Sequence, residues 1–137
     1  MHPASTALRI GARILTGSTY AILGADAFRL PGGRVGQAST TIAAMRRILP
    51  LPADDEQVVK ANAAVQAIAG AALALGWFPR VSALALAASL VPTTIAGHAF
   101  WAIEDPLARK LQRVQFQKNL AMIGGLLFAV LDTKRPR

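Results

Sequence analysis

The chain has 137 residues, of which 53% are hydrophobic and 16% are charged, with 15 basic residues, 7 acidic residues and no cysteine. Soluble domains usually carry about 25% charged residues, so this composition argues against an ordinary water-soluble fold. Without cysteine, the chain itself has no disulfide framework, thiolate metal site or dithiol redox chemistry. The net charge of +8 does not indicate nucleic-acid binding, because the basic residues flank long apolar runs, as they do beside membrane spans.

Four apolar stretches are each near the length that a membrane-spanning helix needs. A hydrocarbon core about 30 Å thick requires roughly 20 helical residues. The stretches cover about residues 8–28, 57–78, 81–101 and 106–131. The connection between the second and the third is so short that these two helices must form an antiparallel hairpin. The sequence therefore predicts an all-α, integral membrane four-helix up-down bundle, with residues 1–137 as one domain, the last helix longest and both termini on one side.

The long connection between the first two stretches contains a further helical pattern. Its apolar residues recur at helical spacing, namely Ile42, Met45, Ile48 and Leu49. We therefore expect a short helix over about residues 39–49. Two interpretations stay open, a helix lying on the membrane surface and an ordinary buried loop helix.

Glycines and one acidic residue predict details of the helices. Close helix packing is expected at four glycines, because small residues let membrane helices approach one another: Gly70, Gly76, Gly124 and Gly125. The pair Asp105-Pro106 is typical of an N-cap followed by the first helical residue. The last span should therefore begin at Pro106.

Polar side chains collect in one half of the predicted bundle. In up-down order, the end of span one, the start of two, the end of three and the start of four meet the same membrane face. The candidate ligand- or partner-binding residues in this half are Asp26, Arg29, Asn62, Gln66, His98, Trp101, Gln115, Lys118 and Asn119. Polar groups inside a membrane bundle are by default candidates for a functional site. The alternative is that they hydrogen-bond one another and fasten the helices.

Two of these candidates also have simpler interpretations. Asp26 and Arg29 are three residues apart, a spacing at which a helix-end ion pair is expected. His98 is the only histidine in the membrane region, and either a hydrogen-bonding core position or contact with a ligand fits it. One histidine without cysteine or a spaced carboxylate pair completes neither a haem site nor a metal site. We expect no catalytic residue, no metal and no cofactor. The ligand considered for the polar half is a quinone or a lipid.

Several motifs together resemble the DoxX family of small four-helix membrane proteins. They are Asp26-Ala27-Phe28-Arg29-Leu30-Pro31, Asn62 with Gln66, LVPTTIAGHAFW at 90–101, Asp105-Pro106, and QFQKNLAMIGGLLFAVLDT at 115–133. The resemblance covers about residues 7–133 and is closest to the form seen in actinobacteria. The family name comes from a subunit associated with quinone-linked thiosulfate oxidation, and mycobacterial relatives are associated with oxidative-stress enzymes at the membrane.

The resemblance implies an accessory or scaffold subunit that associates with a membrane or membrane-docked oxidoreductase. The alternative is a binding or transport protein for an amphipathic ligand, such as a quinone or a lipid, held in the polar half of the bundle. An autonomous enzyme is the weakest of the three hypotheses, since no catalytic motif transfers to these positions. The expected surroundings are the cell membrane, with a second membrane protein or another copy of the chain as partner and no nucleic acid.

Overall fold

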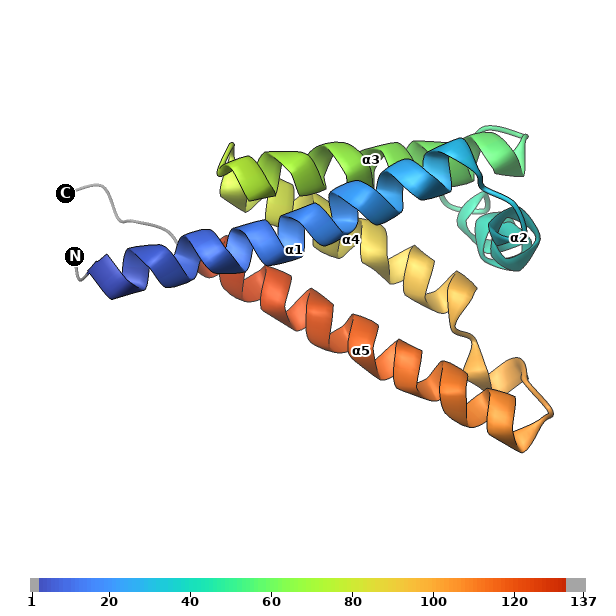
Figure 1. Ribbon diagram of the computed structural model, residues 1–137. Coiled ribbons are helices and arrows are strands. Elements are labelled where there is room, and N and C mark those ends of the chain that lie inside the picture. The colour runs from blue at the N-terminus through green and yellow to red at the C-terminus, as the bar shows by residue number, and fades with distance from the viewer. Residues whose placement is uncertain (1–2, 133–137) are drawn as a thin grey trace.

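The computed structural model describes residues 3–132, which form five α-helices and one short 3-10 helix (Figure 1). These are α1 (Pro3–Arg29), α2 (Arg34–Met45), α3 (Asp55–Leu75), α4 (Pro79–Gly97), η1 (Phe100–Ala102) and α5 (Pro106–Leu131). The all-α class is confirmed. The count of four helices is corrected to five, because the connection between α1 and α3 contains a helix of 12 residues. The longest helix is α1, with 27 residues, rather than α5, with 26.

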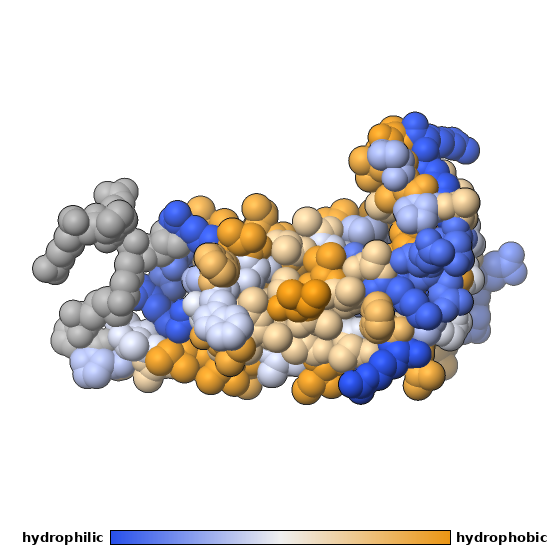
Figure 2. Space-filling view, turned by 90° about the horizontal axis from the view of Figure 1, so that it is seen from above, coloured by the Kyte–Doolittle hydropathy of each residue, from blue (hydrophilic) through white to orange (hydrophobic). Residues whose placement is uncertain are grey.

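Three helical segments of the described chain are long and apolar enough to cross a membrane. They are Asp55–Leu75, Pro79–Ala102 and Pro106–Leu131. The predicted four spans are therefore corrected to three by length and composition, since α1 is long enough but carries charged residues toward both of its ends and hydroxyls between them. In Figure 2 apolar surface occupies the middle of the molecule and hydrophilic surface lies toward both ends, the distribution that a bilayer requires.

The helices α1 and α3 lie side by side, with their backbones in contact at three glycines. A Cβ atom built on Gly17 would lie 2.5 Å from the backbone nitrogen of Ala74, and one on Gly70 would lie 2.5 Å from that of Ala21. A Cβ on Gly24 would lie 2.5 Å from the nitrogen of Ala67. No side chain fits at these distances, so the glycines set the separation of the two helices.

The predicted packing role is therefore right for Gly70 and wrong for three other glycines. A Cβ atom added to Gly124 or Gly125 would meet no neighbouring atom within 4 Å, so α5 packs on nothing at these two positions. Gly76 instead ends α3, with a φ of 75° that favours glycine. The sequence interpretation missed Gly17 and Gly24, which lie one heptad apart on α1 and carry the contact.

The helix α4 occupies the centre, because it packs against α2, α3 and α5. The largest fully buried side chains come from three helices, Leu73 of α3, Leu86 of α4 and Leu126 of α5. This core lies toward the end where α3 turns into α4. Away from it, α5 diverges from α1 and α3 (Figure 1), and Leu126 remains the only buried residue of α5.

The helix α2 packs on α3 and α4 through buried Ile42. It covers residues 34–45 rather than 39–49, and the remaining residues of the predicted helix form a turn. Arg46 holds that turn, since its guanidinium donates to the carbonyls of Pro52 and Ala53 and pairs with the Asp55 carboxylate at 2.6 Å. The start of α3 is thereby tied to the end of α2.

Two helix starts follow the sequence signals. The Asp105 carboxylate accepts a hydrogen bond from the Ala108 backbone nitrogen at 2.7 Å, and Pro106 is the first residue of α5. This confirms the predicted cap. The Asp54 side chain accepts from the Glu56 nitrogen and caps α3 in the same way.

We expect Gly70→Ala to lower the free energy of unfolding by about 1 to 3 kcal/mol, because the added methyl group collides with the α1 backbone. Gly124→Ala is the matched control, since it changes the same residue type in a helix with open space. It should be neutral or stabilise by about 0.5 to 1 kcal/mol. Unfolding titrations in detergent measure both. Equal effects of the two substitutions would contradict the proposed contact.

Candidate functional site

A first group of polar side chains joins α3 to α4 around Thr93. Its hydroxyl oxygen accepts hydrogen bonds from Asn62 Nδ2 at 2.9 Å and Gln66 Nε2 at 3.2 Å, and it donates to the Ser89 carbonyl at 2.9 Å. The Ser89 hydroxyl donates to Asn62 Oδ1 at 2.7 Å. Asn62 and Gln66 therefore lie together, as the sequence predicted, and both bind groups of the neighbouring helix. We call this the α3–α4 seam.

A second group joins α4 to α5. Asn119 Nδ2 donates to the Thr94 hydroxyl at 3.1 Å, and His98 Nδ1 lies 2.7 Å from Gln112 Oε1. Because an amide oxygen only accepts, His98 Nδ1 carries the hydrogen of this contact, and the other ring nitrogen, Nε2, takes no part in it. Nothing in the described part of the chain donates to that Nε2. We call this group the α4–α5 seam.

The two seams are separate, because consecutive residues of α4 point in different directions. Thr93 faces α3 and Thr94 faces α5, and within residues 3–132 no hydrogen bond connects the two groups. The sequence predicted one cluster that converges in the polar half. The structure instead divides four of these residues between two helix interfaces, with Asn62 and Gln66 in one and His98 and Asn119 in the other.

Gln115 and Lys118 lie outside both seams and are exposed. Lys118 Nζ donates to Gln115 Oε1 at 3.2 Å. Helical side chains lean toward the N-terminus of their helix, so the ammonium of Lys118 points toward the η1 end, where it can reach the lipid head groups. None of the three ion pairs found among the described residues involves Lys118.

Asp26 and Arg29 lie at the end of α1, outside the buried core. The ion pair expected between them is not among those formed in the described chain. Arg29 instead lines a shallow hollow of about 250 Å³ beside Phe28 and Ile68. These two charged residues do not contact either seam.

Trp101 belongs to a cluster of three aromatic rings at the η1 end. Its ring centroid lies 5.3 Å from that of Phe100 and 5.8 Å from that of Phe116, with the rings nearly perpendicular. Phe100 and Phe116 are 5.4 Å apart in the same manner. The cluster packs η1 on α5, and the exposed Trp101 suits the membrane interface.

The described side chains of the two seams are hydrogen-bonding groups. Among residues 3–132 no group of three or more His, Cys, Asp or Glu side chains is placed to hold a metal ion. The amides and hydroxyls of the α3–α4 seam bind each other, as fastening groups do. In the α4–α5 seam, His98 Nε2 and Asn119 Oδ1 have no hydrogen-bond partner among residues 3–132.

The family model of DoxX matches residues 8–99, which include most of α1 and all of α2, α3 and α4. The chain belongs to the DoxX family. The match ends before η1 and α5, so the resemblance expected in residues 105–133 rests on the motifs alone. No curated protein and no solved structure matches the chain. The DoxX assignment therefore supports a multi-pass membrane protein, consistent with the three apolar spans.

The sequence predicts that Thr93 and Thr94 satisfy backbone groups beside Pro92, and Thr93 does so at the Ser89 carbonyl. The sequence interpretation missed that Thr93, Thr94 and Ser89 also connect the predicted amides, and that Gln112, predicted on the polar face of the last span, bonds His98. The signal that could have found them is their spacing on one helix, since Ser89 and Thr93 are four residues apart on the face toward α3.

Thr93→Val should destabilise the protein by about 1 to 3 kcal/mol, because it keeps the side-chain shape and leaves two amide donors without their acceptor. Thr94→Val removes the acceptor of one amide and should cost only about 0.6 kcal/mol. Thermal unfolding in one detergent compares the two. The seam described for Thr93 is wrong if Thr94→Val is the more damaging change.

Proposed function

We propose that the chain is an accessory subunit that binds a membrane or membrane-docked oxidoreductase through the outer face of α5. That face is opposite the seam with α4 and is exposed throughout its length. By helical periodicity it contains Lys110, Val114, Gln117, Ala121 and Phe128. A face of this kind binds either lipid or another protein.

Gln117 is the residue that carries the proposal. It lies near the middle of a spanning helix, it is exposed, and its amide has no hydrogen-bond partner among residues 3–132. An amide facing hydrocarbon without a partner is unfavourable, whereas amides between membrane helices form hydrogen bonds. A partner helix on this face would satisfy Gln117. The small residues that follow it, Ala121, Gly124 and Gly125, would allow that helix to approach closely.

We infer the class of partner from the family and from the absence of cysteine in the chain. The chain has no cysteine, so a contribution to thiol redox chemistry would be indirect. DoxX-like proteins are associated with quinone-linked and oxidative-stress enzymes, as the resemblance implies. An accessory role beside such an enzyme in the cell membrane is consistent with both observations.

We further propose that both ends of the chain lie on one side of the membrane. Arg9 near the start of α1 pairs with Asp132 just after α5 at 2.9 Å, so those two points are neighbours. The pairing of α1 along α3 gives the two helices opposite directions (Figure 1). An α1 that crosses the bilayer beside α3 accounts for both contacts, despite its lower hydropathy.

Gln117→Leu should reduce copurification of the partner about tenfold without loss of stability, because one fitted hydrogen bond is worth about 1 to 3 kcal/mol. Gln115→Leu is the matched control, since Gln115 already bonds Lys118 within the chain. The measurement is the amount of oxidoreductase recovered with the tagged chain from native membranes.

A cysteine introduced at position 117 gives a second measurement, because the chain has no other thiol. It should crosslink to the partner, whereas Ile68→Cys on the exposed face of α3 should not. Unchanged recovery with Gln117→Leu would refute the docking face. Crosslinking only to a second copy of the chain would refute the oxidoreductase part and identify a homo-oligomer interface.

The alternative function is binding of a quinone or lipid head group at the α4–α5 seam. The unpartnered His98 Nε2 favours it. If the seam is a ligand site, His98→Gln should lower ligand retention about tenfold with little loss of stability. Lys118→Met tests whether Lys118 takes part in either function. If the variant retains every partner and ligand and has a raised unfolding temperature, Lys118 contributes to neither partner docking nor ligand binding.

A further inference from the structure

A groove of about 880 Å³ lies at the end of the bundle opposite the two seams. It opens between the first half of α1, the turn between α3 and α4, and the last turns of α5. Its inner walls are apolar, with Ile10 from α1, Leu73 from α3, Val81 from α4 and Leu126 from α5 among them. An apolar channel of this kind fits a hydrocarbon chain better than a polar solute.

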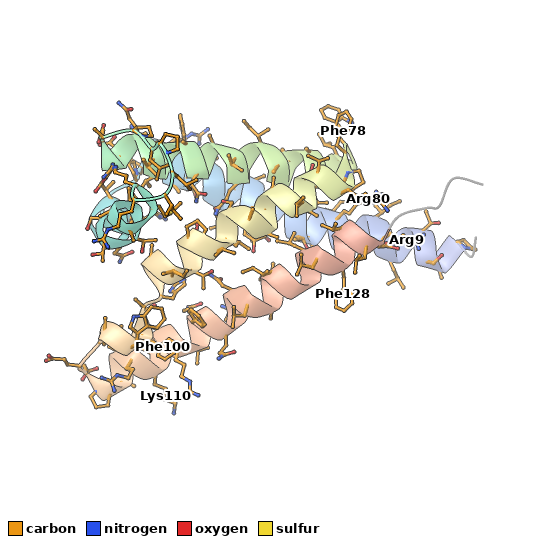
Figure 3. All side chains as sticks on the ribbon, turned by 180° about the vertical axis from the view of Figure 1, so that it is seen from behind. Arg9, Phe78, Arg80, Phe100, Lys110 and Phe128 are labelled. Carbon is orange, nitrogen blue, oxygen red and sulfur yellow. The ribbon has the colours of Figure 1, made fainter. Side chains whose placement is uncertain are left out.

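The mouth of the groove is basic. Arg9, Arg13 and Arg80 line it, with Asp132 as the carboxylate among its lining residues. Figure 3 shows Arg9 and Arg80 at the same end of the molecule as Phe78 and Phe128, away from Phe100 and Lys110. Arg9 pairs with Asp132 at 2.9 Å. After that pair is formed, Arg13 is a cation of the lining that has no ion-pair partner among residues 3–132.

Arg13 is the residue whose environment is incomplete. Its Nε is buried and has no hydrogen-bond partner in the part of the chain that the structure describes. The guanidinium lies over the end of α3, with Nη1 3.3 Å from the position that a Cβ of Gly76 would occupy. The ion pairs formed within residues 3–132 do not include Arg13. A guanidinium can bind an oxyanion with two parallel hydrogen bonds, and Arg13 lines the groove in which such an anion would lie.

The depth of Arg13 matches that of a lipid phosphate. Exposed Trp77 and Phe78 form the turn between α3 and α4, and exposed aromatic residues at a span end mark the interface. Arg13 lies one turn, about 6 Å, further along α1 than Arg9. A phosphate at the groove mouth would therefore be at head-group level, and the apolar walls continue inward from it.

From this geometry we propose that the groove binds one anionic phospholipid, with its phosphate on Arg13 and an acyl chain between α1 and α5. The basic residues at the mouth favour an anionic head group. An acyl chain would also bury the apolar walls, which a small soluble anion would leave exposed. The basic residues of the groove, Arg9, Arg13 and Arg80, are not part of the docking face proposed for α5, although Gly125 borders both.

The test is native mass spectrometry of the purified chain from vesicles of phosphatidylcholine with one-fifth phosphatidylglycerol. The wild-type chain should retain one phosphatidylglycerol in preference to phosphatidylcholine. Arg13→Gln should lower that preference about fivefold, the effect expected for one basic residue at a membrane surface. Lys110→Gln removes the same charge at the other end of the molecule and should leave the preference unchanged.

A second pair of variants tests the acyl-chain part and does not depend on Arg13. Gly125 lines the groove and Gly124 does not, while both have open space beside them. Gly125→Leu should therefore fill the channel and abolish lipid retention, and Gly124→Leu should retain the lipid. Both changes alter helix propensity equally. A difference in lipid retention between the two variants therefore shows that the lipid occupies the groove.

Four results would each overturn the proposal. The wild-type chain could show no preference for the anionic lipid. Lys110→Gln could lower the preference as much as Arg13→Gln, which would mean general charge attraction. Inorganic phosphate alone could displace the lipid and raise the unfolding temperature equally, which would assign the groove to a small anion. If Arg13→Gln does not fold, the glycine pair decides. The proposal is refuted if Gly125→Leu retains as much phosphatidylglycerol as Gly124→Leu does.

Discussion

Backbone contact between α1 and α3 is the constraint from which the other helix positions follow. Gly17, Gly24 and Gly70 bring the two main chains together without intervening side chains. Because α3 turns sharply into α4 at Gly76, fixing α1 on α3 also decides which side of the α3–α4 hairpin is left for α5. That side is the face of α4 that carries Thr94 and His98, and α5 packs there.

The two ends of the bundle are held by different interactions. Toward the turn between α3 and α4, leucines from three helices form a dry core. Toward η1, the contacts of α4 are amide and hydroxyl hydrogen bonds, and each exists only at one relative rotation of its helices. Small residues provide little specificity by shape alone. The polar seams therefore complement the leucine core by selecting a single helix register.

Sequence reasoning recovered the elements with strong local signals. The α3–α4 hairpin, the Asp105 cap and the helical class follow from apolar length and capping chemistry. The division of the polar half into two seams could not be derived, because it depends on the directions in which Thr93 and Thr94 leave α4. The glycine contact was assigned to Gly124 and Gly125 for a related reason, since a small residue permits close packing but does not specify a neighbour.

The composition of α1 has a consequence for biosynthesis. Its hydroxyl residues bind their own helix, as Thr19 does with the Leu15 carbonyl at 2.8 Å, yet α1 is not among the three helical segments of the described chain that are long and apolar enough to cross a membrane. The ribosome completes α1 well before α3, the helix whose glycine face receives it. The packing of α1 at its glycine contacts thus depends on a segment that is translated later. The α3–α4 hairpin serves as the template on which the first helix is finally seated.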